Sequence, residues 1–272
     1  MATLVCFHAH PDDESIGTGG VMRLAADAGH RVVLVLATRG ERGEIVPGVL
    51  DEGEQLSLRR TAEVYAAADS LGVARVEFLG YVDSGMMGEA SNDEPWTFWQ
   101  AAVDSAARRL ATILTEEGVD ALTVYDDNGG YGHPDHIQVH RVGVRAAELA
   151  GVDRVLEGTV NRTAFKRMLS EQRSGALDLE LPEGMEAPDP DEMDLGVEED
   201  RLTHVADVST VVEAKRAAMR AHRSQMGDEH FLLAMPDPIF AVAMGTEWFI
   251  GHGPVGDVGC PLSGIVAPFS AA

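Results

Sequence analysis

The 272-residue chain has few cysteines and no long apolar run. Its two cysteines, Cys6 and Cys260, are too few for the disulfide framework of a small secreted protein. Cys6 lies in an apolar stretch, where a buried and unreactive thiol is the expected state. No apolar run approaches the ~18 residues that a membrane-spanning helix needs, and the first residues lack a signal-like pattern. We therefore expect a cytoplasmic protein without a membrane span.

Basic residues are also scarce, with 21 Lys and Arg against 45 Asp and Glu and a net charge of -24. Binding to a phosphate backbone requires a basic surface, so this charge excludes nucleic acid as a partner. The acidic residues concentrate in residues 178–200, which hold eleven Asp or Glu and no Lys or Arg. Such a segment buries too little apolar surface to order itself well. We expect a solvated acidic loop over residues 174–201, with a lid over an active site as the alternative.

Short apolar segments alternate with helical ones over the first 160 residues. This alternation indicates right-handed βαβ crossovers and a parallel sheet with helices on both faces. We predict an α/β, Rossmann-like core over residues 1–160 and a smaller C-terminal part over residues 202–272, together one domain. The expected strands are residues 3–7, 31–37, 75–79, 121–125 and 154–157, and the expected helices are residues 16–28, 52–71, 98–117 and 134–150.

Apolar spacing also predicts which helix faces are buried and which elements lie beyond the acidic loop. The Gly- and Pro-rich tail, residues 236–272, is expected to form short strands and turns. In residues 52–71 one face holds Leu58, Ala62, Tyr65 and Ala66. Residues 207–225 are expected to form an amphipathic helix that buries Val208, Val211, Val212 and Met219.

Two clusters of imidazole and carboxylate groups each follow a predicted strand. The first is His-Pro-Asp-Asp-Glu at residues 10–14, and the second is Gly-His-Pro-Asp-His at residues 132–136. Because the carboxyl ends of parallel strands share one sheet edge, we expect the clusters to meet there. Neutral imidazole and carboxylate are zinc ligands, and an adjacent carboxylate can act as base toward a water at the metal. The pair of clusters predicts a mononuclear zinc hydrolase.

Two alternative interpretations of the first cluster account for less of the sequence. A turn with an aspartate helix cap explains one carboxylate but not two carboxylates beside a histidine. A dinucleotide loop is not favoured, because Gly17, Gly19 and Gly20 lack the required spacing. These glycines better fit close packing of a helix on the sheet.

With these motifs the sequence resembles the PIG-L/LmbE-like zinc-dependent N-deacetylases, and within them the mycothiol deacetylase and conjugate amidase branch. The family's Ala-His-Pro-Asp-Asp-Glu lies at residues 9–14, and its His-Pro-Asp-His lies at residues 133–136. Supporting similarity lies in residues 40–45, 82–86 and 125–131, and in a helical segment with Lys215, His222 and Arg223 to Gln225.

The resemblance implies one Zn²⁺ per chain held by His10, Asp13 and His136, with Fe²⁺ as the alternative metal. Three protein ligands leave an open coordination position, which a catalytic zinc needs. His140 lies one helical turn beyond His136 and is an alternative ligand, although the family motif does not use it.

Catalytic roles are also implied by the resemblance. Asp12 would be the general base, and His133 would act as an acid or electrostatic group oriented by Asp135. Tyr131 is a candidate hydrogen-bond donor to the oxyanion of the tetrahedral intermediate.

Substrate contacts are implied by the mycothiol branch, where the positions of Glu44, Arg60 and Asp83 touch the glycoside. Each has an alternative. Glu41 competes with Glu44 for its role, Arg60 could be a helix-surface charge, and Asp83 could belong to a turn.

The implied function is a zinc-dependent hydrolase that removes an N-acetyl or other small acyl group from an amino-sugar conjugate. A mycothiol S-conjugate or antibiotic-precursor amidase is the alternative, and a non-catalytic metal- or sugar-binding protein is a remote one. The conjugate amidases carry a lysine soon after the first motif, whereas residues 15–19 here contain none. A homo-oligomer is compatible with the sequence.

Overall fold

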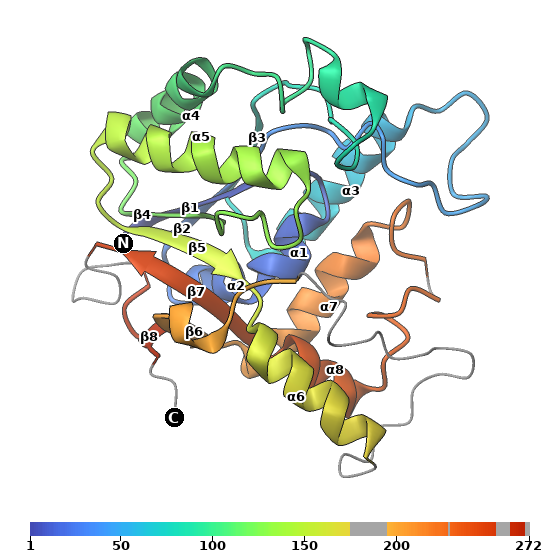
Figure 1. The fold of residues 1–272 in the computed structure, drawn as a ribbon, viewed down its shortest axis with the longest axis vertical. Coiled ribbons are helices and arrows are strands. Elements are labelled where there is room, and N and C mark those ends of the chain that lie inside the picture. The colour runs from blue at the N-terminus through green and yellow to red at the C-terminus, as the bar shows by residue number, and fades with distance from the viewer. Residues whose placement is uncertain (175–194, 228, 254–261, 270–272) are drawn as a thin grey trace.

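The computed structural model describes residues 1–174, 195–227, 229–253 and 262–269. The described residues form an eight-stranded sheet in the order β3-β2-β1-β4-β5-β7-β6-β8 (Figure 1). Neighbouring strands are parallel from β3 to β5 and antiparallel from β5 to β8. The strands are β1 (Thr3–His8), β2 (Arg31–Leu36), β3 (Arg75–Phe78), β4 (Ala121–Tyr125), β5 (Val155–Thr159), β6 (His204–Asp207), β7 (Thr246–His252) and β8 (Ala267–Pro268).

Helices cover both faces of the parallel part of the sheet (Figure 1). One face carries α4 (Val103–Glu117) and α5 (Pro134–Ala150). The other carries α2 (Gly19–Asp27), α3 (Leu56–Leu71) and α7 (Val212–Ala221). The remaining helices are α1 (Asp13–Gly17), α6 (Arg162–Arg173) and α8 (Asp237–Met244), with short 3-10 turns at η1 (Ala90–Asp93), η2 (Glu199–Arg201) and η3 (Ser209–Val211).

Strand β1 shows why its residues form a central strand. Leu4 and Cys6 pack into the core on the α2, α3 and α7 side, whereas Val5 and Phe7 pack into the core against α4 and α5. Successive side chains of a strand point to opposite faces, so a strand covered on both faces is apolar throughout. The predicted α/β class is confirmed, and each predicted strand is present within two residues of its expected bounds.

The helix expected over residues 16–28 is interrupted at Thr18, which separates α1 from α2. The hydroxyl of Thr18 is 2.7 Å from Nε2 of His8. At the start of α2, the Glu247 carboxylate accepts the backbone N–H groups of Gly20 and Val21 at 2.8 and 2.9 Å. These distant partners end one helix and begin the next, so the local apolar pattern could not show the break.

The buried face predicted for α3 is wrong. Leu58 and Tyr65 are 63% and 50% exposed, whereas the polar Arg60 and Glu63 are buried beside Val64. Glu63 accepts hydrogen bonds from the backbone N–H and the hydroxyl of Ser224. Polar residues with buried partners therefore took the core face, which a count of apolar positions alone misassigns.

The C-terminal part extends the same sheet rather than packing as a separate appendage (Figure 1). Residues 207–225, expected to be a single helix, contain the end of β6, the turn η3 and the helix α7. The tail contains the helix α8 and the seven-residue strand β7, which were expected only as short strands and turns, and α6 was not predicted. As expected, Val208, Val212 and Met219 are buried.

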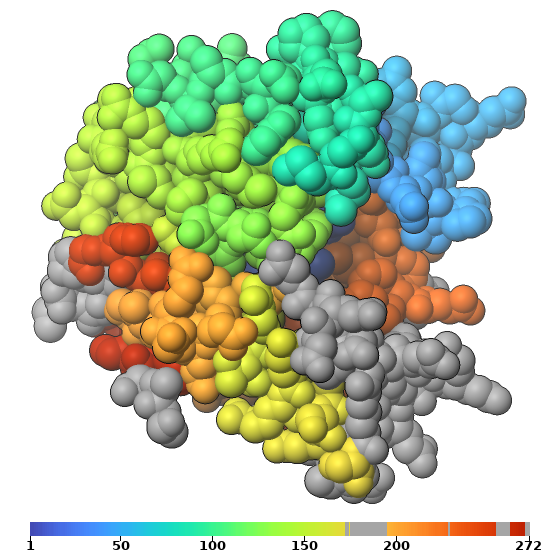
Figure 2. Space-filling model, in the orientation of Figure 1, coloured from blue at the N-terminus to red at the C-terminus, as the bar shows by residue number. Residues whose placement is uncertain are grey.

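In the space-filling view, residues 80–150 occupy the upper half of the molecule, and α6 with the C-terminal strands occupies the lower half (Figure 2). No helix among the described residues is both long enough and apolar enough to cross a membrane. The acidic loop lies largely outside the described residues, which resume at residue 195.

Candidate active site

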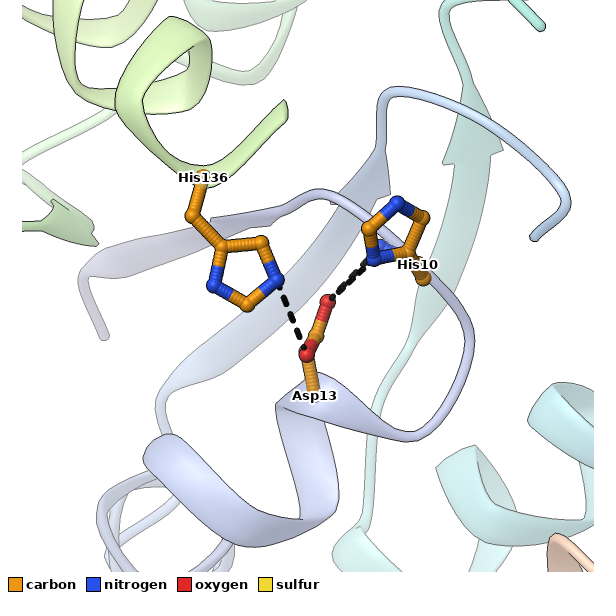
Figure 3. Close-up of side chains that lie close together, drawn as sticks. All are labelled: His10, Asp13 and His136. Atoms are coloured by element: carbon orange, nitrogen blue, oxygen red, sulfur yellow. Dashed lines mark hydrogen bonds and ion pairs between the residues drawn. The ribbon is translucent and has the colours of Figure 1, made fainter. Parts of the chain in front are cut away.

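The two motif clusters meet at the carboxyl edge of the neighbouring parallel strands β1 and β4. The first cluster follows β1 directly, and the second lies where the loop after β4 enters α5. Because the two strands run in the same direction, both loops leave the sheet at the same edge. The structure therefore brings His10, Asp13 and His136 together (Figure 3).

The carboxylate of Asp13 lies between the two imidazoles (Figure 3). Asp13 Oδ2 is 3.3 Å from Nδ1 of His10, and Asp13 Oδ1 is 3.3 Å from Nε2 of His136. One ligand-type atom from each of the three residues lies within 4.8 Å of the others. This set of two imidazoles and one carboxylate matches the donors that zinc takes in hydrolases.

The protonation of His136 leaves one nitrogen free for a metal. Its Nδ1 is 3.2 Å from the carbonyl oxygen of Gly129, which can only accept, so the proton is on Nδ1. Nε2 therefore carries the lone pair, is buried, and has no hydrogen-bond partner among the described residues. A buried imidazole nitrogen that lies 3.3 Å from a carboxylate without a hydrogen bond needs an explanation, and a metal ion beside Asp13 provides one.

His10 is oriented from behind by Asp135. Nε2 of His10 lies 3.2 Å from Asp135 Oδ2, a buried carboxylate that also accepts the backbone N–H of Ser84 at 2.9 Å and the Ser84 hydroxyl. The Nε2 proton of His10 is thus donated away from Asp13, and Nδ1 is the ring nitrogen that faces Asp13. A second overlapping group, His10 with Asp83 and His133, would need that same Nε2 as a ligand, so the geometry favours the first group.

Asp135 contacts His133 through its backbone N–H, while its carboxylate faces His10 and Ser84. The backbone N–H of Asp135 donates to Nδ1 of His133 at 3.1 Å, because His133 is the residue that caps α5. His133 therefore presents its other nitrogen, Nε2, as a donor. Burial, together with the neighbouring His10 and His136, lowers the pKa of His133 to about 4, so the ring is neutral near pH 7.

Asp12 has an unusual backbone conformation beside this group. Its φ of 117° is the only positive φ of a non-glycine residue in the described part of the chain. Burial raises the pKa of Asp12 to about 6, with the Arg60 guanidinium opposing the shift. A partly buried carboxylate with a raised pKa, next to a residue that could hold a metal, has the properties expected of a general base.

Arg60 is not the surface charge that the sequence offered as an alternative. It is 3% exposed, and its guanidinium lies 3.2 Å from Asp12 Oδ2 and 3.0 Å from the carbonyl oxygen of Gly40. It also donates to the carbonyl oxygen of Pro11. A Cβ at Gly40 would lie 2.2 Å from an Arg60 nitrogen, which accounts for glycine at this position. Arg60 is enclosed by protein and contacts the Asp12 carboxylate.

The other expected contacts differ in how exposed they are. Tyr131 is 47% exposed, and its ring centroid lies 5.0 Å from that of His136, so it stands at the rim. Glu44 is exposed and makes no hydrogen bond among the described residues. Asp83 is buried, accepts backbone N–H groups of its own and a neighbouring loop, and lies 3.5 Å from His10 Nε2. Its backbone N–H donates to Glu41 at 3.1 Å, which therefore has a structural partner.

His140, the alternative ligand, lies outside this group. Its Nδ1 is 3.0 Å from the carbonyl oxygen of Tyr125 and 3.6 Å from Glu157.

Several buried residues that support the group were given no role from the sequence. The Tyr125 ring stacks on His136 with centroids 4.3 Å apart, and its hydroxyl lies 2.9 Å from Nδ1 of His8. Glu14 accepts the backbone N–H of Asp12 at 2.8 Å and lies 2.6 Å from Nε2 of His222. His8 in an otherwise apolar strand was the one available signal, since a polar residue there needs a buried partner.

These features are those of a metal-dependent hydrolase. Residues 5–147 match the PIG-L family, described as GlcNAc-PI de-N-acetylase. The chain belongs to this family, and it is a deacetylase.

The chain is 40% identical to "1D-myo-inositol 2-acetamido-2-deoxy-alpha-D-glucopyranoside deacetylase" of Thermomonospora curvata, over 89% of this chain and 87% of the relative. The enzyme of the same name from Acidothermus cellulolyticus is also 40% identical, over 92% and 88% of the two chains.

Solved structures share the fold at lower identity. N,N'-diacetylchitobiose deacetylase from Pyrococcus horikoshii has a TM-score of 0.58 at 21% identity, covering 92% of this chain and 84% of that one. The zinc-inhibited form of teicoplanin deacetylase has a TM-score of 0.61 at 18% identity, covering 100% of both chains.

Proposed function

We propose that this protein is a zinc-dependent deacetylase that removes the N-acetyl group of 1D-myo-inositol 2-acetamido-2-deoxy-α-D-glucopyranoside. The observation that carries the zinc chemistry is the buried Nε2 of His136, which lies 3.3 Å from Asp13 and makes no hydrogen bond among the described residues. The substrate rests on relatives that are 40% identical over about nine-tenths of the chain and carry this activity in their names. The low cysteine content supports a cytoplasmic location.

His10 through Nδ1, Asp13 through its carboxylate and His136 through Nε2 would hold one Zn²⁺. Zinc bound there supplies a water of lowered pKa and a Lewis acid for the amide carbonyl. Support comes from the hydrogen bonds that fix both rings: Gly129 holds Nδ1 of His136, and Asp135 holds Nε2 of His10. Such outer partners select the tautomer that ligates. Fe²⁺ accepts the same donors and is the alternative metal.

Asp12 takes the proton of the attacking water in this proposal. The residue precedes Asp13 in the chain, and Arg60 fixes its carboxylate at 3.2 Å. Because its pKa is raised to about 6, the carboxylate is charged near pH 7 and yet basic enough to accept a proton. The proton taken up by Asp12 is then available for the leaving amine.

His133 and Tyr131 stabilise the negative oxygen of the tetrahedral intermediate. His133 is neutral and presents Nε2–H, since its Nδ1 accepts from the backbone of Asp135. A tyrosine hydroxyl is protonated near pH 7, so that of Tyr131 can donate. Donors fixed in place before the reaction need no reorganisation, which is the physical basis of oxyanion stabilisation.

Glu44 is the expected sugar contact whose side chain remains available, because it is exposed and unpaired among the described residues. Asp83 and Arg60 are engaged by protein groups and act on the site from within.

A mycothiol S-conjugate amidase is the second candidate, because Gly-Glu-Arg-Gly-Glu-Ile at residues 40–45 resembles the amidase version of this loop. The test compares kcat/KM for the N-acetylglucosaminyl-inositol and for a mycothiol S-conjugate at fixed ionic strength, scored by primary-amine release. We expect the former to be preferred. A conjugate preferred tenfold or more, equivalent to about 1.4 kcal/mol of transition-state binding, would establish the amidase instead.

A further inference from the structure

A buried pair joins the C-terminal part of the chain to the first motif. Nε2 of His222 lies 2.6 Å from Oε1 of Glu14, and both residues are fully buried. The two residues are 208 positions apart. Neither belongs to the group of His10, Asp13 and His136 that would hold the metal.

Glu14 connects this pair to Asp12. Its second oxygen, Oε2, accepts the backbone N–H of Asp12 at 2.8 Å, and Oε1 also accepts the Ser15 hydroxyl at 2.7 Å. The carboxylate can receive both the Asp12 N–H and His222 only while it remains in its present orientation. His222 therefore fixes the group that fixes the Asp12 backbone.

The Asp12 backbone needs such support, because its φ of 117° and ψ of -34° are unfavourable for a residue with a side chain. Conformations of this kind raise the free energy by about 1–3 kcal/mol and persist only where the surroundings enforce them. Arg60 holds the carboxylate end of Asp12, and Glu14 holds its backbone end. Both contacts are required to aim the carboxylate.

His222 is itself held rigidly. His222 directly follows α7, and Lys215 of that helix forms a buried 2.7 Å ion pair with Glu247. Two residues later, Ser224 donates to Glu63. Nδ1 of His222 is buried with no partner in the described part of the chain, so the ring makes its hydrogen bond to Glu14 at the expense of one unsatisfied nitrogen. A purely structural role would be filled better by an apolar side chain at this position.

We propose that His222 is a positioning residue for catalysis. Acting through Glu14, it holds the strained backbone of Asp12 so that the Asp12 carboxylate points at the proton that it accepts from the attacking water. Helix α7 thereby completes a site whose other parts come from the loops after β1 and β4. This inference rests on the proposed function, in which Asp12 is the base.

The test compares His222→Ala, His222→Gln and a matched control, Ser224→Ala. The control removes a buried hydrogen bond between the same C-terminal segment and α3 without touching Glu14. Loss of an outer partner typically lowers activity about 10- to 100-fold. We expect His222→Ala to lower kcat by that factor with KM and zinc content unchanged. His222→Gln, whose amide nitrogen can replace Nε2, should recover most of kcat, and Ser224→Ala should keep it within about twofold.

A double-mutant cycle separates positioning from general destabilisation. In the Asp12→Asn background, His222→Ala should lower kcat no further, because the group that it positions is no longer a base. An undiminished further loss would overturn the proposal, as would equal kcat values for His222→Ala and Ser224→Ala or a loss of zinc from His222→Ala. If His222→Ala does not fold, His222→Asn takes its place with the same expectation, since its amide is too short to reach Glu14.

Failure of the proposed function gives a different result. In that case the wild-type protein would release no amine from the sugar substrate, or Asp12→Asn would be fully active, before any His222 variant is compared.

Discussion

The two ends of the parallel sheet both gather charged side chains, and they use them in opposite ways. At the amino edge, Glu117 at the end of α4 lies 2.5 Å from Arg31 Nε and 2.7 Å from Arg75 Nη1. These hydrogen bonds, first that of Arg31, lower the pKa of Glu117 to about 2. At the carboxyl edge, Nε2 of His136 makes no hydrogen bond in the described part of the chain, and burial raises the pKa of Asp12 to about 6.

The two edges differ in how completely their charged and polar groups are paired, and not in residue type. Half-exposed arginines at the amino edge can adjust to the Glu117 carboxylate, so each charge there has an opposite charge within reach. Buried groups at the carboxyl edge are fixed by hydrogen bonds from behind, which leave one nitrogen of His136 and the strained Asp12 facing inward. Groups held in an unsatisfied state are characteristic of reactive sites, and satisfied ones of stability.

The largest expected effect comes from removing one of the three residues at the carboxyl edge that are proposed to hold the metal. His136→Ala or Asp13→Ala removes one of the three donors, so we expect both zinc and amide hydrolysis to be lost. Metal content of the purified variants by atomic emission, with amine release measured alongside, checks this. The control is His140→Ala. His140 lies near Glu157 and not among the three proposed metal ligands, so this variant should retain zinc.

Asp12→Asn should have the next largest effect, because it removes the base and leaves the three donors in place. We expect zinc to be retained and kcat to fall by about 10²–10⁴-fold, the usual contribution of general base catalysis. Equilibrium dialysis against zinc and steady-state kinetics on the same preparation provide the measurement. A metal-free variant, or near-normal kcat, would contradict the division of roles between Asp12 and Asp13.

Arg60→Lys tests whether activity depends on the orientation of the Asp12 carboxylate at the carboxyl edge. Lysine keeps the charge but cannot contact Asp12, Pro11 and Gly40 together, as the planar guanidinium does. We expect kcat to fall by about 10-fold, the lower end for an outer partner, with KM little changed. A rise in KM alone would return Arg60 to the substrate-binding role that the sequence suggested.

Glu117→Gln should have the smallest effect, and it should change the free energy of unfolding without changing catalysis. Glu117 has a folded pKa of about 2 against an ordinary value of 4.5, so its contribution is present above pH 4.5 and is lost as the pH falls toward 2. We expect the variant to lose about 1 kcal/mol of unfolding free energy at pH 7. Urea unfolding at pH 7 and at pH 3.5 should show a smaller difference in unfolding free energy between the wild type and the variant at the lower pH. The kcat at pH 7 should be unchanged.

Glu116→Gln provides the matched control for Glu117→Gln. Its side chain is 57% exposed and lies 3.7 Å from Arg75, so its removal should change stability less. Equal losses for the two variants would show that overall charge, and not the paired geometry, stabilises the amino edge.

The features that could be predicted from the sequence are those with local causes. Strands β1, β2 and β4 are apolar because both their faces are covered. The motifs in the loops that follow β1 and β4 are therefore expected to meet at one sheet edge. The break at Thr18 could not be predicted, because it depends on Glu247, more than 220 residues away. The same is true of His222 beneath Glu14, whose partner is set by the tertiary fold.

Arg60 shows the limit most clearly. Its position on a predicted helix beside Arg59 suggested an exposed charge or a substrate contact, yet it is buried against three groups of the first motif and its neighbouring loop. Burial of an arginine depends on partners from other segments, which spacing within one helix does not encode.

The most direct test of the central claim is a zinc titration of the metal-free protein, with amine release from the N-acetylglucosaminyl-inositol substrate measured at each addition. If His10, Asp13 and His136 hold the catalytic ion, chelation should abolish activity, and activity should rise linearly with added zinc and level off at one equivalent per chain. Full activity in the chelator-treated protein, with no response to zinc, would contradict the claim.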